Sequence, residues 1–185
     1  VYFEKERDWQ RYVDSRRLEI TCGEAPYLVS RYDAATGEEL PIENRIGILD
    51  RKLRVVNENT NNEADWLKWT RRAFESTYGY EYQGDNLLVA RINLLMTFVD
   101  YMQERWQREP TAKELNQIAN VICWNFWNTL IRTRALHCIP KSSSDWANAC
   151  IRVITLISSR KIMRFLRRFA MVSRLKPTIP SSKNL

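Results

Sequence analysis

The sequence has few of the residues that commonly carry redox or metal chemistry. It contains one histidine, His137, and four cysteines with no C-x-x-C spacing among them. Zinc sites and thioredoxin-type redox sites need closely spaced cysteines. The sequence therefore predicts that the protein binds no metal and that its cysteine thiols stay reduced. His137 is next to Cys138, but adjacent residues of an extended segment point in opposite directions. This argues against a Cys–His nucleophile pair.

Long apolar runs are also lacking. No stretch of about 18 apolar residues could form a transmembrane helix, and no segment is typical of a secretory signal. We therefore expect a cytoplasmic protein that is neither exported nor membrane-spanning. The apolar fraction of 44%, with 7 Trp, 8 Tyr and 6 Phe, is still sufficient to form a core in a chain of 185 residues.

Acidic residues are almost absent from the last part of the chain. Residues 129–185 contain 12 Lys and Arg but only Asp145, whereas residues 1–128 contain 17 Lys and Arg against 21 Asp and Glu. This asymmetry predicts a domain over 1–128 and a basic appendage over 129–185, with a linker, a helix over 146–175 and a disordered end. Such an appendage would attract DNA, an anionic membrane or an acidic partner; a merely solvated basic helix is the alternative. The candidate nucleic-acid-binding residues are Arg160, Lys161, Arg164, Arg167 and Arg168.

Hydrophobic periodicity predicts the secondary structure of the first 128 residues. The expected order is β-α-α-β-α-α-β after a short amphipathic helix, which indicates an α/β fold with a parallel sheet. We expect helices at 1–15, 42–58, 63–76 (capped by Asn62), 85–105 and 111–119, and strands at 16–22, 77–82 and 120–127. The aromatic stretch 124–127 is interpreted as a core strand; a base-stacking surface is the alternative.

Two of these strands end in a carboxylate before a turn or a helix. Glu19 precedes the Cys22-Gly23-Glu24 turn, and Glu81 precedes a helix. Doubly wound α/β domains present nucleoside ligands at the carboxyl ends of their strands, so these residues form the candidate site. An ordinary strand end with a solvated glutamate is the alternative.

These stretches resemble motifs of a known family. The residues LEITCGEAPYL at 18–28 resemble the first motif of N6-adenine DNA methyltransferases. The residues YGYE at 78–81, followed by ARINL at 90–94, resemble the second motif and its helix. With the stretch IGILDRKL at 46–53, residues 16–127 resemble the methylase subunits of bacterial restriction–modification systems.

The resemblance implies a partial doubly wound, Rossmann-like sheet that binds S-adenosylmethionine. Glu19, Cys22, Gly23 and Glu24 would lie near the methionine part of the cofactor. Glu81 would accept hydrogen bonds from both ribose hydroxyls. No metal is implied at this site.

The chain departs from the family pattern in three respects. Ala25 replaces the usual second glycine, Thr21 is not preceded by the usual proline, and no Asn/Asp-Pro-Pro-Tyr/Phe sequence occurs. That last loop holds the flipped adenine, which base-modifying enzymes need to enclose in a pocket. We therefore expect a truncated or degenerate adenine-methyltransferase-like protein that binds S-adenosylmethionine and nucleic acid but is not catalytic alone.

Other functions are compatible with the same residues. A non-enzymatic phage or mobile-element inhibitor of a host nuclease, such as an anti-restriction or anti-CRISPR protein, is the main alternative, and its partner would be a nucleic-acid-binding host protein. A further alternative is that the basic appendage is an out-of-frame product without function. Asp85, Asp100 and Glu104 could suggest a nuclease metal site, but acids one turn apart are ordinary on an exposed helix face.

Overall fold

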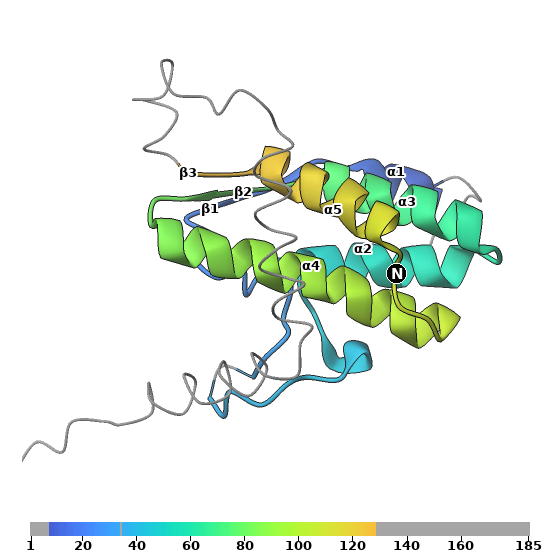
Figure 1. Cartoon of the computed structure of the whole chain (residues 1–185), viewed down its shortest axis with the longest axis horizontal. Coiled ribbons are helices and arrows are strands. Elements are labelled where there is room, and N and C mark those ends of the chain that lie inside the picture. Colours follow the sequence, from blue (N-terminus) through green and yellow to red (C-terminus); the bar gives the residue numbers. More distant parts are fainter. Residues whose placement is uncertain (1–7, 34, 129–185) are drawn as a thin grey trace, which may run out of the picture. The chain divides into compact units, whose positions relative to one another are not determined.

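The computed structural model describes residues 8–33 and 35–128. In this part the chain forms a mixed α/β structure with a three-stranded parallel sheet and five α-helices (Figure 1). The elements are α1 Asp8–Asp14, β1 Arg17–Ile20, the 3-10 helix η1 Ile42–Asn44, α2 Ile48–Asn59, α3 Glu63–Glu75, β2 Thr77–Glu81, α4 Gly84–Trp106, α5 Ala112–Asn125 and β3 Phe126–Asn128.

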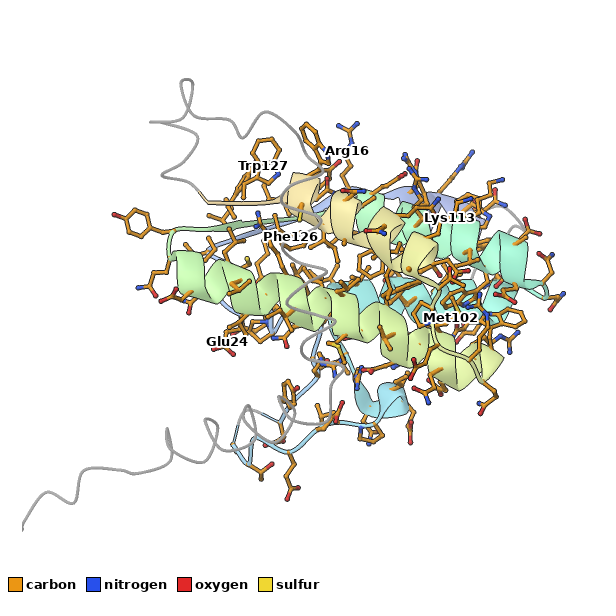
Figure 2. The ribbon with its side chains drawn as sticks, viewed as in Figure 1. Arg16, Glu24, Met102, Lys113, Phe126 and Trp127 are labelled. Atoms are coloured by element: carbon orange, nitrogen blue, oxygen red, sulfur yellow. The ribbon has the colours of Figure 1, made fainter. Side chains whose placement is uncertain are left out.

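The parallel sheet expected from the order of elements is confirmed. The strands lie in the order β1-β2-β3, with Glu19 opposite Gly79 and Gly79 opposite Phe126. Crossover connections between parallel strands are almost always right-handed. Because the three strands lie side by side in chain order, both right-handed crossovers run over the same face of the sheet, and their helices are directed to that face. Figure 2 shows Phe126 on the side of β3 that faces α4 and Trp127 on the opposite side.

The core lies between the helices and this face of the sheet. Phe98 of α4 stacks on Trp66, at 6.2 Å between ring centroids, and meets Phe74 edge-on at 6.3 Å. Gly79 of β2 allows the Phe126 ring of β3 to pack directly against the backbone of β2. A Cβ atom at Gly79 would lie 2.5 Å from two ring atoms of Phe126, so no larger residue fits there.

Local capping signals mark the helix boundaries. The side chain of Asn62 accepts a hydrogen bond from the Asp65 amide at 2.8 Å, which confirms it as the cap of α3. Thr111 and Glu114 form a reciprocal capping box at the start of α5. Gln107, with a φ of 52°, ends α4 in the left-handed conformation.

The predicted strand at 120–127 is wrong over most of its length. Helix α5 continues to Asn125, and only residues 126–128 form β3. Ile118, Ala119 and Ile122 make a buried stripe with helical spacing, and Trp124 is 62% exposed rather than part of the core. Helical packing of this stripe prevails over the high strand propensity of the aromatic and β-branched residues.

The predicted helix at 42–58 is also divided. Residues 42–44 form η1, and α2 begins only at Ile48. Gly47 precedes α2 and packs closely on the preceding loop: a Cβ atom there would lie 2.3 Å from the carbonyl oxygen of Leu28. Ile46, which lies within the predicted helix, is in the loop before α2 and is 73% exposed.

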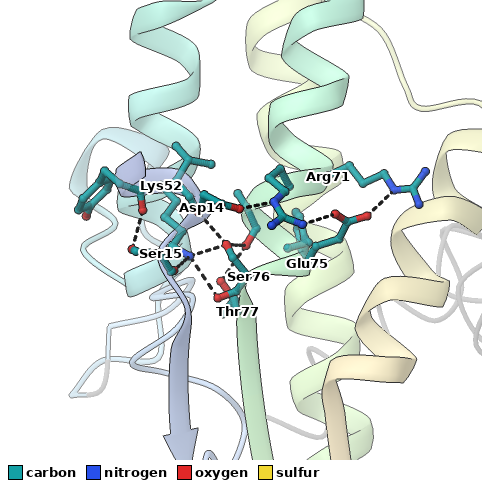
Figure 3. Close-up of polar contacts among 12 residues, drawn as sticks. Asp14, Ser15, Lys52, Arg71, Glu75, Ser76 and Thr77 are labelled. Carbon is teal, nitrogen blue, oxygen red and sulfur yellow. Dashed lines mark hydrogen bonds and ion pairs between the residues drawn. The ribbon is translucent and has the colours of Figure 1, made fainter. Parts of the chain in front are cut away.

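A buried lysine joins the amino ends of β1 and β2 (Figure 3). Lys52 of α2 is 1% exposed, and its Nζ donates to the Ser15 carbonyl at 2.7 Å and to Ser76 Oγ at 2.6 Å. The Ser76 carbonyl lies 3.3 Å from the same nitrogen. Burial lowers the pKa of Lys52 to about 7. This amine therefore connects both strand starts to α2.

Two buried arginines attach the segment between β1 and α2 to α4. Arg31 and Arg45 are 4% and 2% exposed, and both pair with Asp100, the Arg45 contact being 2.7 Å. Both also pair with Glu39, at 3.0 and 3.4 Å. Asp100 is thus a structural ion-pair partner. Among the described residues, no group of three potential metal ligands is present.

None of the helices within residues 8–33 and 35–128 has the length and apolar character needed to cross a membrane. The predicted helix at 146–175, the five basic residues proposed to bind nucleic acid and His137 lie outside the described residues. Residues 1–7 of the predicted first helix do as well.

Candidate functional site

The carboxyl ends of β1 and β2 bring the predicted site residues together. The Cys22 amide donates to the Tyr80 carbonyl at 2.8 Å, so the pairing of the two strands continues past the end of β1. The Gly23 amide then donates to Glu81 Oε2 at 2.7 Å. Glu19 and Glu81 both act electrostatically on Cys22, which places the three side chains in one cluster.

The loop that follows β1 has an unusual backbone. Thr21, Gly23 and Ala25 have φ angles of 59°, 54° and 66°, in the left-handed region. This region favours glycine and is a genuine outlier for a β-branched residue such as Thr21. Ala25, at the position of the second glycine in the motif that it resembles, has a backbone conformation that glycine adopts most easily.

Glu19 has a buried acceptor without a donor. Its Oε2 atom is buried and has no hydrogen-bond partner among the described residues, and burial raises the pKa of Glu19 to about 7. An unsatisfied buried acceptor costs free energy. A ligand that brings a hydrogen-bond donor or a positive charge would offset that cost, and shifted carboxylates of this kind are frequent at functional sites.

Cys22 is not suited to nucleophilic chemistry. The residue is 1% exposed, and burial together with Glu19 and Glu81 raises the pKa of its thiol to about 12. The thiol is therefore neutral at physiological pH, whereas the thiolate is the reactive form. Cys22 packs against β2: a Cβ atom at Gly79 would lie 3.1 Å from its sulfur.

Helix α4 fixes the loop through residues that sequence reasoning did not assign to the site. Asn93 Nδ2 donates to the Glu24 carbonyl at 3.0 Å, while the side chain of Glu24 is exposed. Arg91 donates to the Phe126 carbonyl at 2.6 Å. The Ala-Arg-x-Asn-Leu pattern was the available signal: its polar members connect the helix to the loop and to β3.

Glu81 is already heavily hydrogen-bonded. Its Oε1 accepts from the amides of Tyr82 and Gln83 at 2.8 and 2.9 Å, and its Oε2 accepts from Gly23. The Gln83 amide, with those of Gly23 and Tyr82, holds the pKa of Glu81 below its usual range. A carboxylate offers about four acceptor positions, so about one remains. Glu81 in this arrangement can accept one hydroxyl hydrogen bond rather than two.

No family model, curated protein or solved structure matches this chain. The candidate site is defined by its own residues, which are the carboxylates of Glu19 and Glu81 and the left-handed loop 21–25 between them.

The pKa of Glu19 has a consequence for stability. Between its ordinary value of 4.5 and about 7, the folded chain binds a proton that the unfolded chain has released, so stability falls as pH rises through this range. Glu19→Gln should therefore be as stable as the wild type at pH 4.5. At pH 8 we expect it to be more stable by about 1–2 kcal/mol, after allowance for partial exposure. Urea denaturation at both pH values measures this, with the exposed Glu38→Gln as control. A difference between Glu19→Gln and wild type that is independent of pH would contradict the assignment.

Proposed function

We propose that this edge of the sheet binds S-adenosylmethionine, and that residues 16–127 form the cofactor-binding part of a doubly wound, adenine-methyltransferase-like domain. The observation that carries the proposal is the buried, unpartnered oxygen of Glu19 beside the left-handed loop. S-adenosylmethionine carries an ammonium and a sulfonium group, and either would compensate a buried carboxylate.

The position of the site supports the proposal. Ligands of open α/β sheets bind outside the carboxyl ends of parallel strands, where loops leave the sheet. Glu19, the loop 21–25 and Glu81 all lie at this edge, and α4 begins there at Gly84. A Cβ atom at Gly84 would meet no atom within 4 Å, so the start of α4 is open to an approaching ligand.

The residues fit the cofactor in part. Glu19 offers an acceptor for the amino group, and Ala25 has the backbone conformation expected of a glycine position. Glu81 fits one ribose hydroxyl; binding both would require the Gly23 amide to move from Oε2. When bound, the cofactor supplies an electrophilic methyl group. The protein residues bind and orient it, and the sequence contains no Asn/Asp-Pro-Pro-aromatic loop to hold a flipped base.

Calorimetric titration of the full chain with S-adenosylmethionine tests the proposal. We expect binding by wild type and at least about a tenfold loss for Glu19→Gln, since removing one charge-assisted contact costs about 1.5–3 kcal/mol. Because this variant should fold at least as stably as wild type at pH 8, lost binding would not reflect unfolding. Glu38→Gln should bind as wild type does.

Labelled methyl transfer to DNA should stay at background in the same samples. Absence of binding by wild type, or equal affinity in Glu19→Gln, would contradict the proposal. Methylation above background that depends on Glu19 would show that the chain has a base pocket, and would refute its non-catalytic role.

A further inference from the structure

The face of the sheet opposite the helices carries exposed apolar side chains. Leu18 and Ile20 of β1 are 50% and 69% exposed. Tyr78 and Tyr80 are paired with them on β2 and are half-buried. Trp127 of β3, opposite Tyr80, points to the same side (Figure 2). These five residues, one continuous set across three strands, are here termed the open face.

A parallel sheet with one uncovered face is physically unfavourable. Parallel sheets occur almost only with both faces covered, because βαβ units bury both sides of their strands. By the right-handed crossover rule, the β1 to β2 and β2 to β3 connections of the described residues run over one face, and Phe126 faces α4 on that side (Figure 2). Helices α2 to α5 therefore cannot cover the open face.

We propose that the open face is covered by residues 129–151 of the same chain. Residue 129 directly follows β3, and Asn128 is paired with Glu81 at the carboxyl edge of the sheet, so the segment starts beside the open face. Three strands spaced about 4.8 Å apart are about 10 Å wide, and 23 residues span about 35 Å even as a helix. The segment is long enough to cross the whole face.

The composition of the segment fits this role. It contains six large apolar residues, three basic residues and a single acid, Asp145. The open face has apolar and tyrosine side chains, so burial of apolar area can drive the contact. The apolar residues are Leu130, Ile131, Leu136, Ile139, Trp146 and Ile151.

Two matched substitutions in the full chain test the proposal. Ile20 and Ile46 are almost equally exposed in the described structure, at 69% and 73%, but only Ile20 lies on the open face. If residues 129–151 cover Ile20, Ile20→Lys buries a charge and should lower the Tm by at least about 5 °C, whereas Ile46→Lys should change it by less than about 2 °C. Ile20→Thr, a milder change, keeps the comparison measurable if Ile20→Lys does not fold.

Limited trypsin digestion adds a readout at the segment itself. Cleavage after Arg132, Arg134 or Lys141 should be at least about fivefold faster in Ile20→Lys than in Ile46→Lys, because loss of cover raises the open population. Sedimentation of both variants must show monomers. Equal Tm and cleavage in the two variants would overturn the proposal. A wild-type dimer that Ile20→Lys dissociates would also overturn it, since a second copy would then cover the face.

Discussion

Asp100→Asn is expected to lower the free energy of unfolding by about 3–5 kcal/mol, because it leaves two buried guanidinium groups short of a counter-charge. Arg31 and Arg45 are both nearly inaccessible to solvent, and Asp100 Oδ2 accepts from each of them. After the substitution, Glu39 would be the remaining carboxylate paired with both, and its side chain is 51% exposed. A half-exposed carboxylate is a weak partner for two buried cations.

Urea denaturation of the full chain at pH 7 measures this effect. Asp85→Asn, on the exposed first turn of the same helix, is the matched control and should cost less than about 1 kcal/mol. Asp100→Glu, which keeps the charge, should lose less stability than Asp100→Asn. A loss below 1 kcal/mol for Asp100→Asn would mean that the arginines are compensated in another way.

Lys52→Met should cost about 1–3 kcal/mol at pH 9. Met fills a similar volume but leaves the Ser15 carbonyl without a donor, and an orphaned buried acceptor costs about 1–3 kcal/mol. The Ser76 carbonyl keeps its hydrogen bond from the Arg17 amide at 2.9 Å. Both carbonyls lie where β1 and β2 begin (Figure 3), so the loss should be global rather than local.

The same lysine predicts a rise of stability with pH. Its folded pKa of about 7 lies below the ordinary value of 10.5. Above pH 7 the unfolded chain therefore binds a proton that the folded chain has released. Stability should rise by about 2 kcal/mol between pH 7 and pH 9 in wild type and in the exposed control Lys68→Met, and stay flat in Lys52→Met. An equal rise in all three would show that Lys52 is not the titrating group.

The parallel sheet and most helices follow from local patterns, because apolar periodicity and capping residues act over a few residues. Asn62 marks the start of α3 from sequence alone. The predictions fail where contacts with residues distant in the sequence determine the local structure. At the end of α5, the side-chain amide of Asn125 donates to the carbonyls of Phe74, Glu75 and Thr77, and no local sequence pattern reveals these contacts.

The candidate site was predictable as a location but not in its bonding. Two carboxylates at the ends of parallel strands indicate where a ligand would approach, since such ends share one edge. That Glu81 uses most of its acceptor positions on backbone amides depends on how the loop 21–25 folds across β2. The role of Asn93 likewise depends on α4 lying against that loop.

The hydrogen bonds of Glu81 also determine where the entropy cost of ordering the loop arises. The Glu81 carboxylate accepts hydrogen bonds from the Gly23 amide in the loop after β1 and from the Tyr82 and Gln83 amides in the loop after β2. The two loops are therefore fixed to each other when the chain folds. Ordering a flexible loop during association would subtract from affinity, about 1–2 kcal/mol for each backbone residue fixed. A ligand that enters at this edge meets a preorganised rim, and that conformational entropy is lost in folding rather than in binding.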